Sequence, residues 1–455
     1  MGAWIEGWFA RITLHSLAIT VSVLTYILTT RVERERRPPS IAIAWVLGLI
    51  AIPYAALPLY LLFGRRKLKR KAAPAVRAHP GSSWAEDLIG SFGLPPAAPS
   101  AVRLHRDGGE SRLALFETIG RACARLDICT YILRDDILGR EVMARMVERA
   151  QSGVRVRLLL DGVGALQLSR RGFKRLHAGA VETAVFSPLL ARNTSGPRNL
   201  RNHRKAVVAD DAILWAGGRN FAAEYFDGAP GVPAWLDLSF DLEGAAAAAA
   251  AAQFEADWVA SGGGPAERLA AARTGAAGGR TQFVPSGPDQ SEDTVHALLI
   301  DACFHANERL LAVTPYFVPD SSLETALRLA ARRGVKIDLC IPASSNHVLA
   351  DFVRNRALRS LAKAGVAIHL LPYMAHAKAV VFDSTLALCG SVNLDSRSLL
   401  INYESAVAFY DLREIDWLAQ WIGALIPGAQ RFDRRPPGLL RDLGEGLLLT
   451  MAYQL

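Results

Sequence analysis

Two histidines occur in the same short motif, one in each half of the sequence. The motif reads His-x-Lys-x4-Asp, and a Gly-x-x-Asn segment begins 14 residues after each histidine. The residues concerned are His203, Lys205, Asp210 and Asn220 in the first copy, and His376, Lys378, Asp383, Ser391 and Asn393 in the second. A histidine and a lysine two residues apart on a strand point to one face of it. The Asp falls at a turn, and the apolar residues on either side of that turn predict a hairpin.

These side chains suit the transfer of a phosphoryl-type group. One histidine can attack phosphorus, while the other protonates the departing alkoxide and later deprotonates the incoming alcohol. The lysines, the asparagines and Ser391 can stabilise the negative charge that builds on the non-bridging oxygens. The sequence has no cluster of His, Cys or carboxylates at ligand spacing, so we expect neither a metal nor a cofactor.

The alternative reading is two ordinary hairpins whose histidines and lysines face solvent. One chance match to the motif is expected in roughly a hundred such chains, but two matches with the same flanking Gly and Asn are far rarer. Lysine is scarce here, with eight lysines among 52 basic residues, yet both motif positions keep it. A compact ammonium differs geometrically from a guanidinium fork, so this choice favours the catalytic interpretation.

The motifs lie in two similar stretches of chain. Each has the order helix, strand, helix, glycine, strand. The predicted elements are 113–124, 127–133, 139–151 and 153–161 in the first stretch, and 294–307, 310–317, 322–333 and 334–342 in the second. Alternating helices and apolar strands predict an α/β fold with a largely parallel sheet covered on both faces. A helical alanine run at 245–252 and a Gly/Ala-rich segment at 261–279 separate the halves.

The first seventy residues have a different character. Residues 12–30 and 41–63 are two runs without a charged residue, and each is long enough to cross a hydrocarbon core about 30 Å thick. We expect two transmembrane helices, the second kinked at Pro53 and Pro58. A signal peptide followed by a buried helix is disfavoured, because a second apolar run follows the first at once.

Basic residues flank both runs and predict the orientation. The connector has four arginines between Arg31 and Arg37, and the other side has Arg11 and six basic residues between Arg65 and Lys71. This asymmetry favours both termini, and therefore the catalytic domain, in the cytoplasm. Anionic headgroups would attract the cluster at 65–71, and the net charge of +9 also fits an anionic partner.

The motifs together resemble the phospholipase D superfamily, and most closely the bacterial cardiolipin synthases. The segments concerned are Leu61-Leu-Phe-Gly-Arg-Arg-Lys67, Asn199-Leu-Arg-Asn-His-Arg-Lys205, Thr314-Pro-Tyr-Phe-Val-Pro-Asp320, Gly390-Ser-Val-Asn-Leu-Asp-Ser-Arg-Ser398 and Asn402-Tyr-Glu404. The resemblance implies a pseudo-dimeric α/β sandwich with the site between the halves. It also implies condensation of two phosphatidylglycerols into cardiolipin and glycerol at a bacterial inner (plasma) membrane. By position, Glu404 matches the family carboxylate that orients a histidine, which we expect to be His376, and His203 is then the nucleophile.

The first half departs from the family pattern at two places. Gly218 stands where serine is usual, and no glutamate follows His203 at the offset that separates Glu404 from His376. Asp237 lies nearby and is the candidate substitute. Tyr131 and Tyr316 follow equivalent strands, where they fit a lipid pocket and a strand core equally well.

Other activities of the superfamily stay open at this point. They are phospholipase D hydrolysis, transfer to another acceptor alcohol, and cleavage of nucleic acid; the membrane segment argues against the last, so no nucleic-acid partner is expected. A catalytically inactive membrane scaffold is disfavoured by two complete motifs. The sequence does not reveal the oligomeric state. The expected organisation is an anchor at 1–71, a linker at 72–105, halves at 106–262 and 281–427 joined by a linker at 263–280, and a tail at 428–455.

Overall fold

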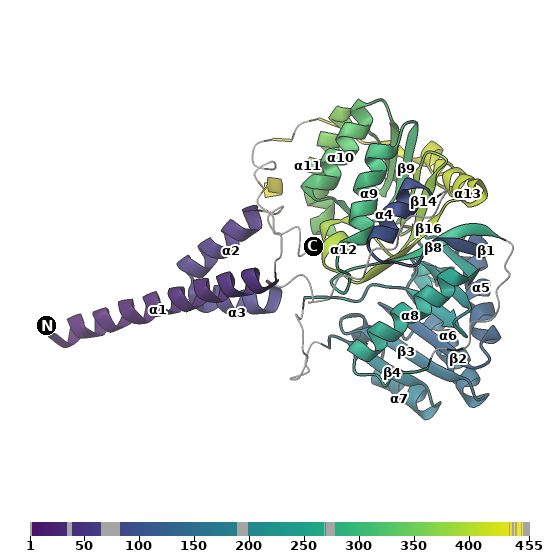
Figure 1. Cartoon of the computed structure of the whole chain (residues 1–455), viewed down its shortest axis with the longest axis horizontal. Helices are drawn as coiled ribbons and strands as arrows, with labels where there is room; N and C mark the ends of the chain where they lie inside the picture. Colours follow the sequence, from purple (N-terminus) through teal and green to yellow (C-terminus); the bar gives the residue numbers. More distant parts are fainter. Residues whose placement is uncertain are drawn as a thin grey trace. The chain divides into compact units, whose positions relative to one another are not determined.

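The computed structural model describes residues 2–33, 39–64, 82–188, 199–267 and 278–435, together with 269, 437–438, 441, 444–446 and 448. The chain divides into two compact units (Figure 1). One holds the three N-terminal helices, and the other holds the two repeated halves and their sheet.

The N-terminal helices are α1 (Gly2–Glu33), α2 (Pro39–Ala51) and α3 (Pro53–Phe63). The second apolar run is divided at Ile52, whose φ and ψ of −139° and 63° are not helical. Proline disfavours the α conformation of the residue before it, so Pro53 accounts for the break. No helix within the described ranges combines the length and the apolar content needed to cross a bilayer. The basic residues at 34–37 and 65–71 lie outside the described residues.

Fifteen of the described strands of the second unit form one mixed sheet, in the order β17-β12-β11-β9-β13-β14-β16-β8-β1-β7-β6-β5-β2-β3-β4. The other two, β10 (Phe317–Val318) and β15 (Leu394–Asp395), form a separate parallel pair. The first half contributes β1 (Ala98–His105), β2 (Arg125–Thr130), β3 (Arg155–Asp161), β4 (Glu182–Phe186), β5 (Ala206–Ala209), β6 (Ile213–Gly217) and β7 (Ser239–Gly244). The second contributes β8 (Gly279–Ser286), β9 (Arg309–Val313), β11 (Lys336–Pro342), β12 (Ala367–Leu371), β13 (Ala379–Phe382), β14 (Leu386–Gly390), β16 (Glu404–Phe409) and β17 (Gln430–Arg431).

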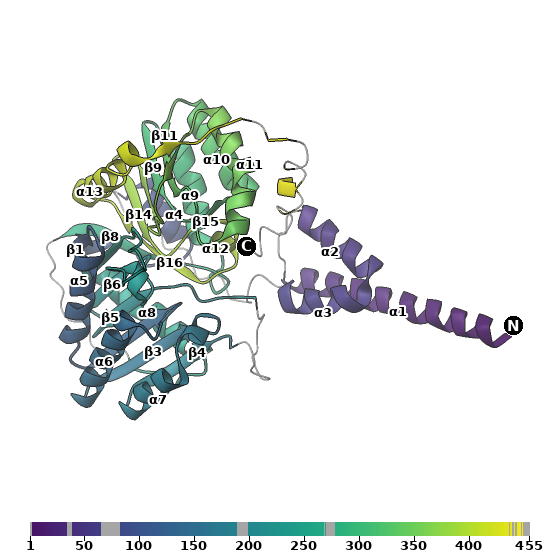
Figure 2. The same cartoon turned by 180° about the vertical axis from the view of Figure 1, so that it is seen from behind.

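The strand order is the same in both halves when read outward from the centre. The antiparallel pair β1–β8 joins the halves (Figure 2). A pseudo-twofold therefore relates β7 to β16, β6 to β14 and β5 to β13. Within the described part of this sheet, parallel pairing is confined to the outer strands β2, β3 and β4 and their counterparts β9, β11 and β12. The prediction of a largely parallel sheet was therefore wrong. The hairpins that follow the motif residues, β5–β6 and β13–β14, bring antiparallel strands to the middle of each half.

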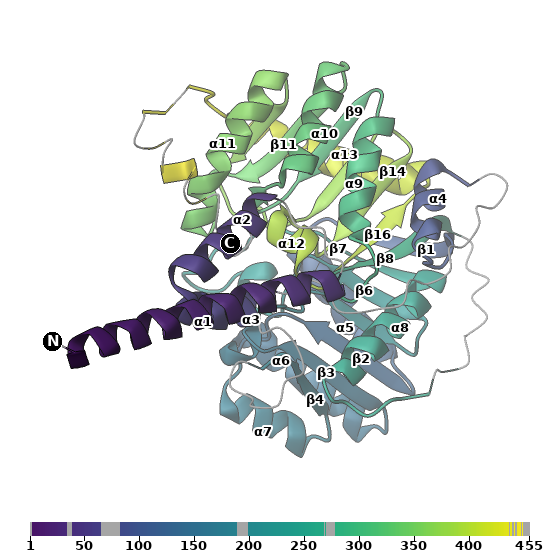
Figure 3. The ribbon, with the colours of Figure 1, turned by 60° about the vertical axis from the view of Figure 1, so that its left-hand side comes forward.

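Helices cover both faces of the sheet, as expected for apolar strands. In the first half these are α5 (Gly108–Arg121), α6 (Ile137–Gln151), α7 (Arg170–Ala178) and α8 (Ala245–Ala260). In the second they are α9 (Thr294–His305), α10 (Ser321–Arg332), α11 (Val348–Ala364), α12 (Ser396–Leu400) and α13 (Leu412–Gly423). The order α5-β2-α6-β3 recurs as α9-β9-α10-β11, which confirms the predicted repeat. Helices α9, α10 and α11 lie side by side (Figure 3).

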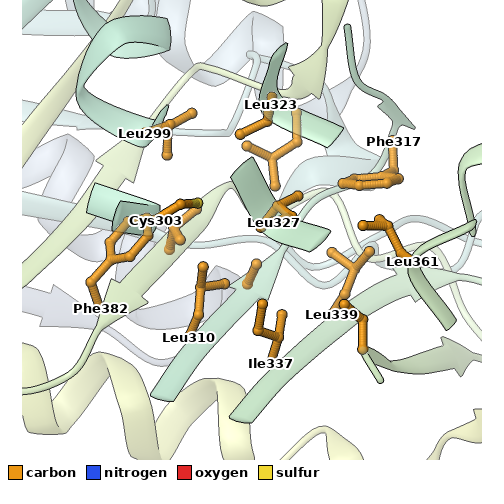
Figure 4. A pocket seen from close by; sticks show the side chains of 14 residues that line it. Leu299, Cys303, Leu310, Phe317, Leu323, Leu327, Ile337, Leu339, Leu361 and Phe382 are labelled. Carbon is orange, nitrogen blue, oxygen red and sulfur yellow. The ribbon is translucent and has the colours of Figure 1, made fainter. Parts of the chain in front are cut away.

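The hydrophobic core joins the two halves. On one face, the alanine run of α8 and the apolar side of α13 pack against strands of both halves in a single cluster. A separate cluster lies under α5 and α6 in the first half. Under α9, α10 and α11, an apolar cavity of about 20 Å³ is lined by side chains such as Leu327, Phe317 and Leu339 (Figure 4). Its volume suits about one water molecule and its lining offers no hydrogen bond, so it belongs to the core.

Two of the segments predicted as linkers or tail contain structure. The range 72–105 includes α4 (Trp84–Ser91) and β1, and β1 lies at the centre of the sheet. The range 428–455 includes β17 and Glu445, whose buried carboxylate pairs with Arg359 of α11. Composition marks these ranges as rich in Ala, Pro, Gly and Arg, but does not show their pairing with distant strands and helices.

Candidate active site

Each motif histidine lies just before a central strand and is held there by the backbone of the other half. His203 and Lys205 precede β5, and the N–H of His203 donates to the carbonyl of Tyr403 at 2.8 Å. His376 and Lys378 precede β13, and the N–H of His376 donates to the carbonyl of Leu236 at 2.6 Å. Both contacts belong to short parallel bridges between the halves, Asn202 with Tyr403 and Leu236 with Ala375.

The residue that follows each of these bridges provides a carboxylate to the site. Glu404 follows Tyr403, and its Oε1 lies 3.0 Å from Nδ1 of His203. Asp237 follows Leu236, and its Oδ2 lies 2.7 Å from Nδ1 of His376. The expectation that Glu404 orients His376 was therefore wrong, because each carboxylate contacts the histidine of the opposite half. Both carboxylate side chains are fully buried.

The register of the hairpins shows that Asp237 is the counterpart of Glu404. Gly217 pairs with Ser239, as Gly390 pairs with Ala406, so Asp237 and Glu404 both lie two residues before the paired position. Asp237 follows Gly217 by 20 residues, whereas Glu404 follows Gly390 by 14. Counting a fixed offset from the histidine missed this equivalence, because the first half has a longer connection between its strands.

The same comparison explains glycine at position 218. In the second half, Ser391 and Ser398 donate to the two oxygens of Glu404, at 2.5 and 2.6 Å. In the first half the aspartate is shorter, and its carboxylate occupies the space where a serine side chain would begin. A Cβ on Gly218 would lie 2.2 Å from Oδ1 of Asp237, which is incompatible with van der Waals contact.

The two motif lysines lie beside the histidines and are almost fully buried. Nζ of Lys205 donates to the carbonyl of His203 at 2.8 Å, and Nζ of Lys378 lies 3.1 Å from Nε2 of His376. Burial lowers the pKa of Lys205 to about 8 and that of Lys378 to about 7, although Glu404 and Asp237 act in the opposite direction. Lys205 also lowers the pKa of Lys378, which shows that the two halves share one electrostatic environment.

The protein environment lowers the pKa of both motif histidines. Burial lowers the pKa of His376 to about 3, and the charge of Lys378 adds to this effect against the attraction of Asp237. Burial likewise lowers the pKa of His203, with Glu404 opposing. Burial would raise the pKa of Asp237, but the contact with His376 and the nearby cations hold it at about 2. Two buried carboxylates and two buried ammonium groups therefore surround two imidazoles.

The asparagines and two tyrosines complete the candidate site. The Oδ1 atoms of Asn220 and Asn393 are buried without a hydrogen-bond partner in the described part of the chain, and such buried polar atoms call for an explanation such as a bound ligand or water. The ring of Tyr131 lies 5.0 Å from that of His203, and the ring of Tyr225 lies 4.9 Å from that of His376. Tyr316 instead donates from its hydroxyl to Asn346.

The motif aspartates have a different environment. The carboxylate of Asp210 accepts three backbone N–H bonds from residues 123–125, and that of Asp383 accepts three from residues 307–309, all at 2.7–2.9 Å. Both residues have a positive φ, 51° and 49°, which aspartate tolerates better than most residues. Each carboxylate therefore stabilises the turn that leads into β2 or β9. It lies at the end of the hairpin that is away from the histidine.

Sequence reasoning also missed Arg204, which lies between the catalytic motif residues. Its buried guanidinium contacts Asp257 of α8 at 2.6 Å and Asp289 at 2.9 Å, and its Nε donates to the carbonyl of Glu404 at 3.0 Å. The bond to the carbonyl of Glu404 holds the backbone of Glu404 against the segment that contains His203. The only available signal was an arginine inside the motif, and arginine is too common in this chain to stand out.

Among the residues that the structure describes, no three His, Cys, Asp or Glu side chains converge as metal ligands. The site instead offers two imidazoles, two ammonium groups and amide groups. This set can bind a phosphodiester and supply both a nucleophile and a proton donor.

Comparisons with known proteins identify the family of the chain. The family model described as "Cardiolipin synthase, PLD-like domain" matches residues 115–258 and 299–426, and "Phospholipase_D-nuclease N-terminal" matches 18–65. A cardiolipin synthase A of Pseudomonas aeruginosa is 31% identical over 421 residues, covering 87% of this chain and 86% of that protein. A cardiolipin synthase of Geobacillus kaustophilus is 29% identical, covering 93% and 90%. The chain belongs to the cardiolipin synthase family of the phospholipase D superfamily.

A solved structure supports the fold independently. The phosphatidylserine synthase of Haemophilus influenzae superimposes with a TM-score of 0.60 at 14% sequence identity, covering 80% of this chain and 97% of that one. At this identity the likeness concerns the fold alone. It confirms the phospholipase D-like α/β architecture with two repeated halves.

The first prediction concerns the motif aspartates. Asp383→Ala removes the acceptor of three backbone N–H groups, so we expect a loss of about 1–3 kcal/mol in the free energy of unfolding. Thermal unfolding of the purified protein measures it, with Asp416→Ala, whose side chain is 52% exposed, as the near-neutral control. An unchanged melting temperature together with lost catalysis would assign Asp383 a direct catalytic role instead.

The second prediction concerns pH. Lys205 and Lys378 lose their charge as the pH rises through their pKa values of about 8 and 7. The affinity for dimethyl phosphate, a monoanion over this range, should therefore fall about tenfold between about pH 6 and about pH 9, since charged hydrogen bonds are lost. Calorimetric titration measures the affinity. Lys378→Arg, which stays charged, should flatten the profile, and a wild-type affinity independent of pH would contradict the lowered pKa values.

Proposed function

We propose that this chain is a phosphatidyltransferase that joins two phosphatidylglycerols into cardiolipin and releases glycerol. The observation that supports it most is the pair of motif histidines, each with a buried carboxylate at Nδ1 and a lysine beside it. The relatives named cardiolipin synthase, which cover most of this chain, support the choice of substrate.

In the first step, Nε2 of one histidine attacks the phosphorus of phosphatidylglycerol. A P–N bond forms and the P–O bond to the glycerol headgroup breaks, and the second histidine donates its proton to the departing alkoxide. Burial lowers the pKa of both imidazoles, so the proton donor takes up a proton from solvent when the negative phosphodiester binds and raises its pKa. Lys205, Lys378 and the amides of Asn220 and Asn393 stabilise the charge on the non-bridging oxygens.

In the second step, the headgroup hydroxyl of another phosphatidylglycerol gives its proton to the second histidine and attacks phosphorus. The P–N bond breaks, cardiolipin leaves, and both histidines return to their starting states. The carboxylates Glu404 and Asp237 hold each imidazole with Nε2 directed at the substrate, because a hydrogen bond at Nδ1 fixes the tautomer. Ser391 acts through Glu404 rather than directly.

We propose His203 as the nucleophile. Its side chain is 13% exposed, against 3% for His376, and in the described part of the chain its Nε2 has no hydrogen bond to protein. Nε2 of His376 instead lies beside the ammonium of Lys378. The contact with Glu404 does not distinguish the two histidines as nucleophile and proton donor, since each of them has a carboxylate partner.

The proposed location is the bacterial inner (plasma) membrane, with two N-terminal spans and the catalytic domain in the cytoplasm. The apolar side chains on α1, α2 and α3 support it, because many of them are exposed, and Leu14, Leu17 and Leu47 are each more than 60% exposed. A contiguous apolar surface of this kind is costly in water. The anchor at 1–71 and the two halves at 106–262 and 281–427 complete the proposed organisation.

A phospholipase D hydrolase is the alternative, with water in place of the second lipid. The chemistry of the first step is the same, so the acceptor alone separates the two activities. The relatives named cardiolipin synthase favour the lipid acceptor.

The third prediction is that phosphatidylglycerol alone is a sufficient substrate. Purified protein in phosphatidylglycerol micelles should release glycerol and cardiolipin in equal amounts, measured by mass spectrometry. Phosphatidic acid as the product, without cardiolipin, would replace the proposal with the hydrolase.

The fourth prediction assigns the histidines. His203→Ala and His376→Ala should each abolish turnover, because nucleophile and acid act as a unit. With radiolabelled phosphatidylglycerol, His376→Ala should retain a small amount of acid-labile, protein-bound label, and His203→Ala should retain none. The opposite pattern would make His376 the nucleophile.

The fifth prediction concerns topology. A cysteine introduced at position 34 should react in intact cells with a reagent that does not cross the membrane, and one introduced at the C-terminus should not. Labelling of the C-terminal cysteine alone would place the catalytic domain on the outer side.

A further inference from the structure

A basic pocket lies between α10 and α11, away from the candidate active site. Its volume is about 370 Å³, and its lining includes Arg328, Arg332, Arg356, Arg359, Ser360 and Lys363. None of the described residues that line it is acidic. A volume above roughly 300 Å³ is typical of pockets that hold small molecules.

The chain path separates this pocket from the catalytic residues. The first residue of β13, next to Lys378, pairs with the last residue of β9, so the site lies at the carboxyl end of β9. Helix α10 runs back from that end and finishes before β11, whose first residue pairs with the first of β9. Arg328 and Arg332, in the second half of α10, are therefore displaced toward the opposite edge of the sheet.

Most of the positive charges in this pocket are not neutralised. Arg359 pairs with Glu445, but Arg328, Arg332, Arg356 and Lys363 have no carboxylate partner among the residues that the structure describes. Other surface arginines do have partners, for example Arg103 with Glu117 and Arg155 with Glu182, both at 2.7 Å.

The helix dipole accounts for only part of this cluster. Arg332 and Lys363 lie in the last turns of their helices, where basic residues are favourable. Arg328 and Arg356 lie further from the helix ends, beyond the range of that effect. Four like charges around one concavity repel each other, and a bound anion would relieve the repulsion.

We propose that the basic pocket binds the phosphate-bearing headgroup of an anionic phospholipid at the membrane surface, as a docking site distinct from the active site. Arginine forks match phosphate oxygens, and the hydroxyl of Ser360 adds a donor. The exposed side chain of Leu329, between Arg328 and Arg332 in sequence, adds apolar surface to the same helix. Basic and apolar groups together are typical of surfaces that lie on anionic membranes.

The inference rests on the proposed function only in choosing a lipid over a soluble phosphate as the occupant. It implies that the face formed by α10 and α11 contacts the bilayer while the catalytic site turns over. The headgroup bound in this pocket is not consumed, since the pocket lacks a nucleophile and a proton donor of the kind that the histidines supply.

Cysteine labelling tests the proposal on the full chain. Ser360→Cys is reconstituted in phosphatidylcholine vesicles with or without phosphatidylserine, and its rate of maleimide labelling is divided by that of the native, exposed Cys123. We expect phosphatidylserine to lower this ratio about fivefold, which corresponds to roughly one charge–headgroup contact. Adding Arg332→Glu and Arg356→Glu should restore the ratio. The control variant Arg106→Glu and Lys336→Glu reverses the same number of charges at exposed residues outside the pocket. It should keep the protection.

Two outcomes would overturn the proposal. A ratio unaffected by phosphatidylserine would show that no lipid occupies the pocket, and equal protection by sodium phosphate would make it a site for soluble anions. Activity on phosphatidylglycerol micelles is measured in the same variants. If Ser360→Cys with the pocket arginines intact shows no protection but keeps its activity, the docking site alone is overturned, whereas a wild-type protein that produces no cardiolipin would overturn the proposed function.

Discussion

The structure of the site depends on the exchange of carboxylates between the two halves. Glu404 and Asp237 are fully buried, and each is paired with the histidine of the other half. Removing the histidine from such a contact leaves a buried carboxylate without its hydrogen-bond partner, which costs at least about 1–3 kcal/mol. Neither half alone can therefore hold its histidine in place. The shared core and the β1–β8 pair are needed to keep these contacts together.

The exchanged carboxylates also help to determine the charge of the site. Burial disfavours every charged group, yet two carboxylates and two lysines lie within one region that is closed to solvent. The carboxylates stay ionised, since the pKa of Asp237 is held at about 2, while the pKa values of Lys205 and Lys378 fall to about 8 and 7. The lysines are thus close to losing their protons until an anion arrives. A phosphodiester supplies the negative charge that stabilises them and at least one protonated imidazole.

The sequence was sufficient for the motifs and the repeat, because these depend on local spacing and periodicity. Prediction from the sequence failed for the features that depend on contacts between distant strands. Parallel pairing holds for β2–β3–β4 and not for the whole sheet as predicted, and β1, which lies within the predicted linker, forms the centre of the sheet. Glu404 was assigned to the histidine nearest in sequence, His376, because a motif offset carries no information about the other half. Arg204, with partners 53 and 85 residues away, had no local signal at all.

The two histidines are related by the pseudo-twofold but do not have equal support. The carboxylate of Glu404 accepts from Ser391 and Ser398 as well as contacting His203, so both of its oxygens are fixed. Asp237 contacts His376 through one oxygen, and among the described residues its other oxygen accepts only the local N–H of Leu238 at 2.7 Å. Gly218 follows from this difference, since the shorter aspartate fills the space of the missing serine. A nucleophile must hold one geometry through both displacements, whereas a proton donor must accept and release its proton, and the firmer support lies on the side of His203.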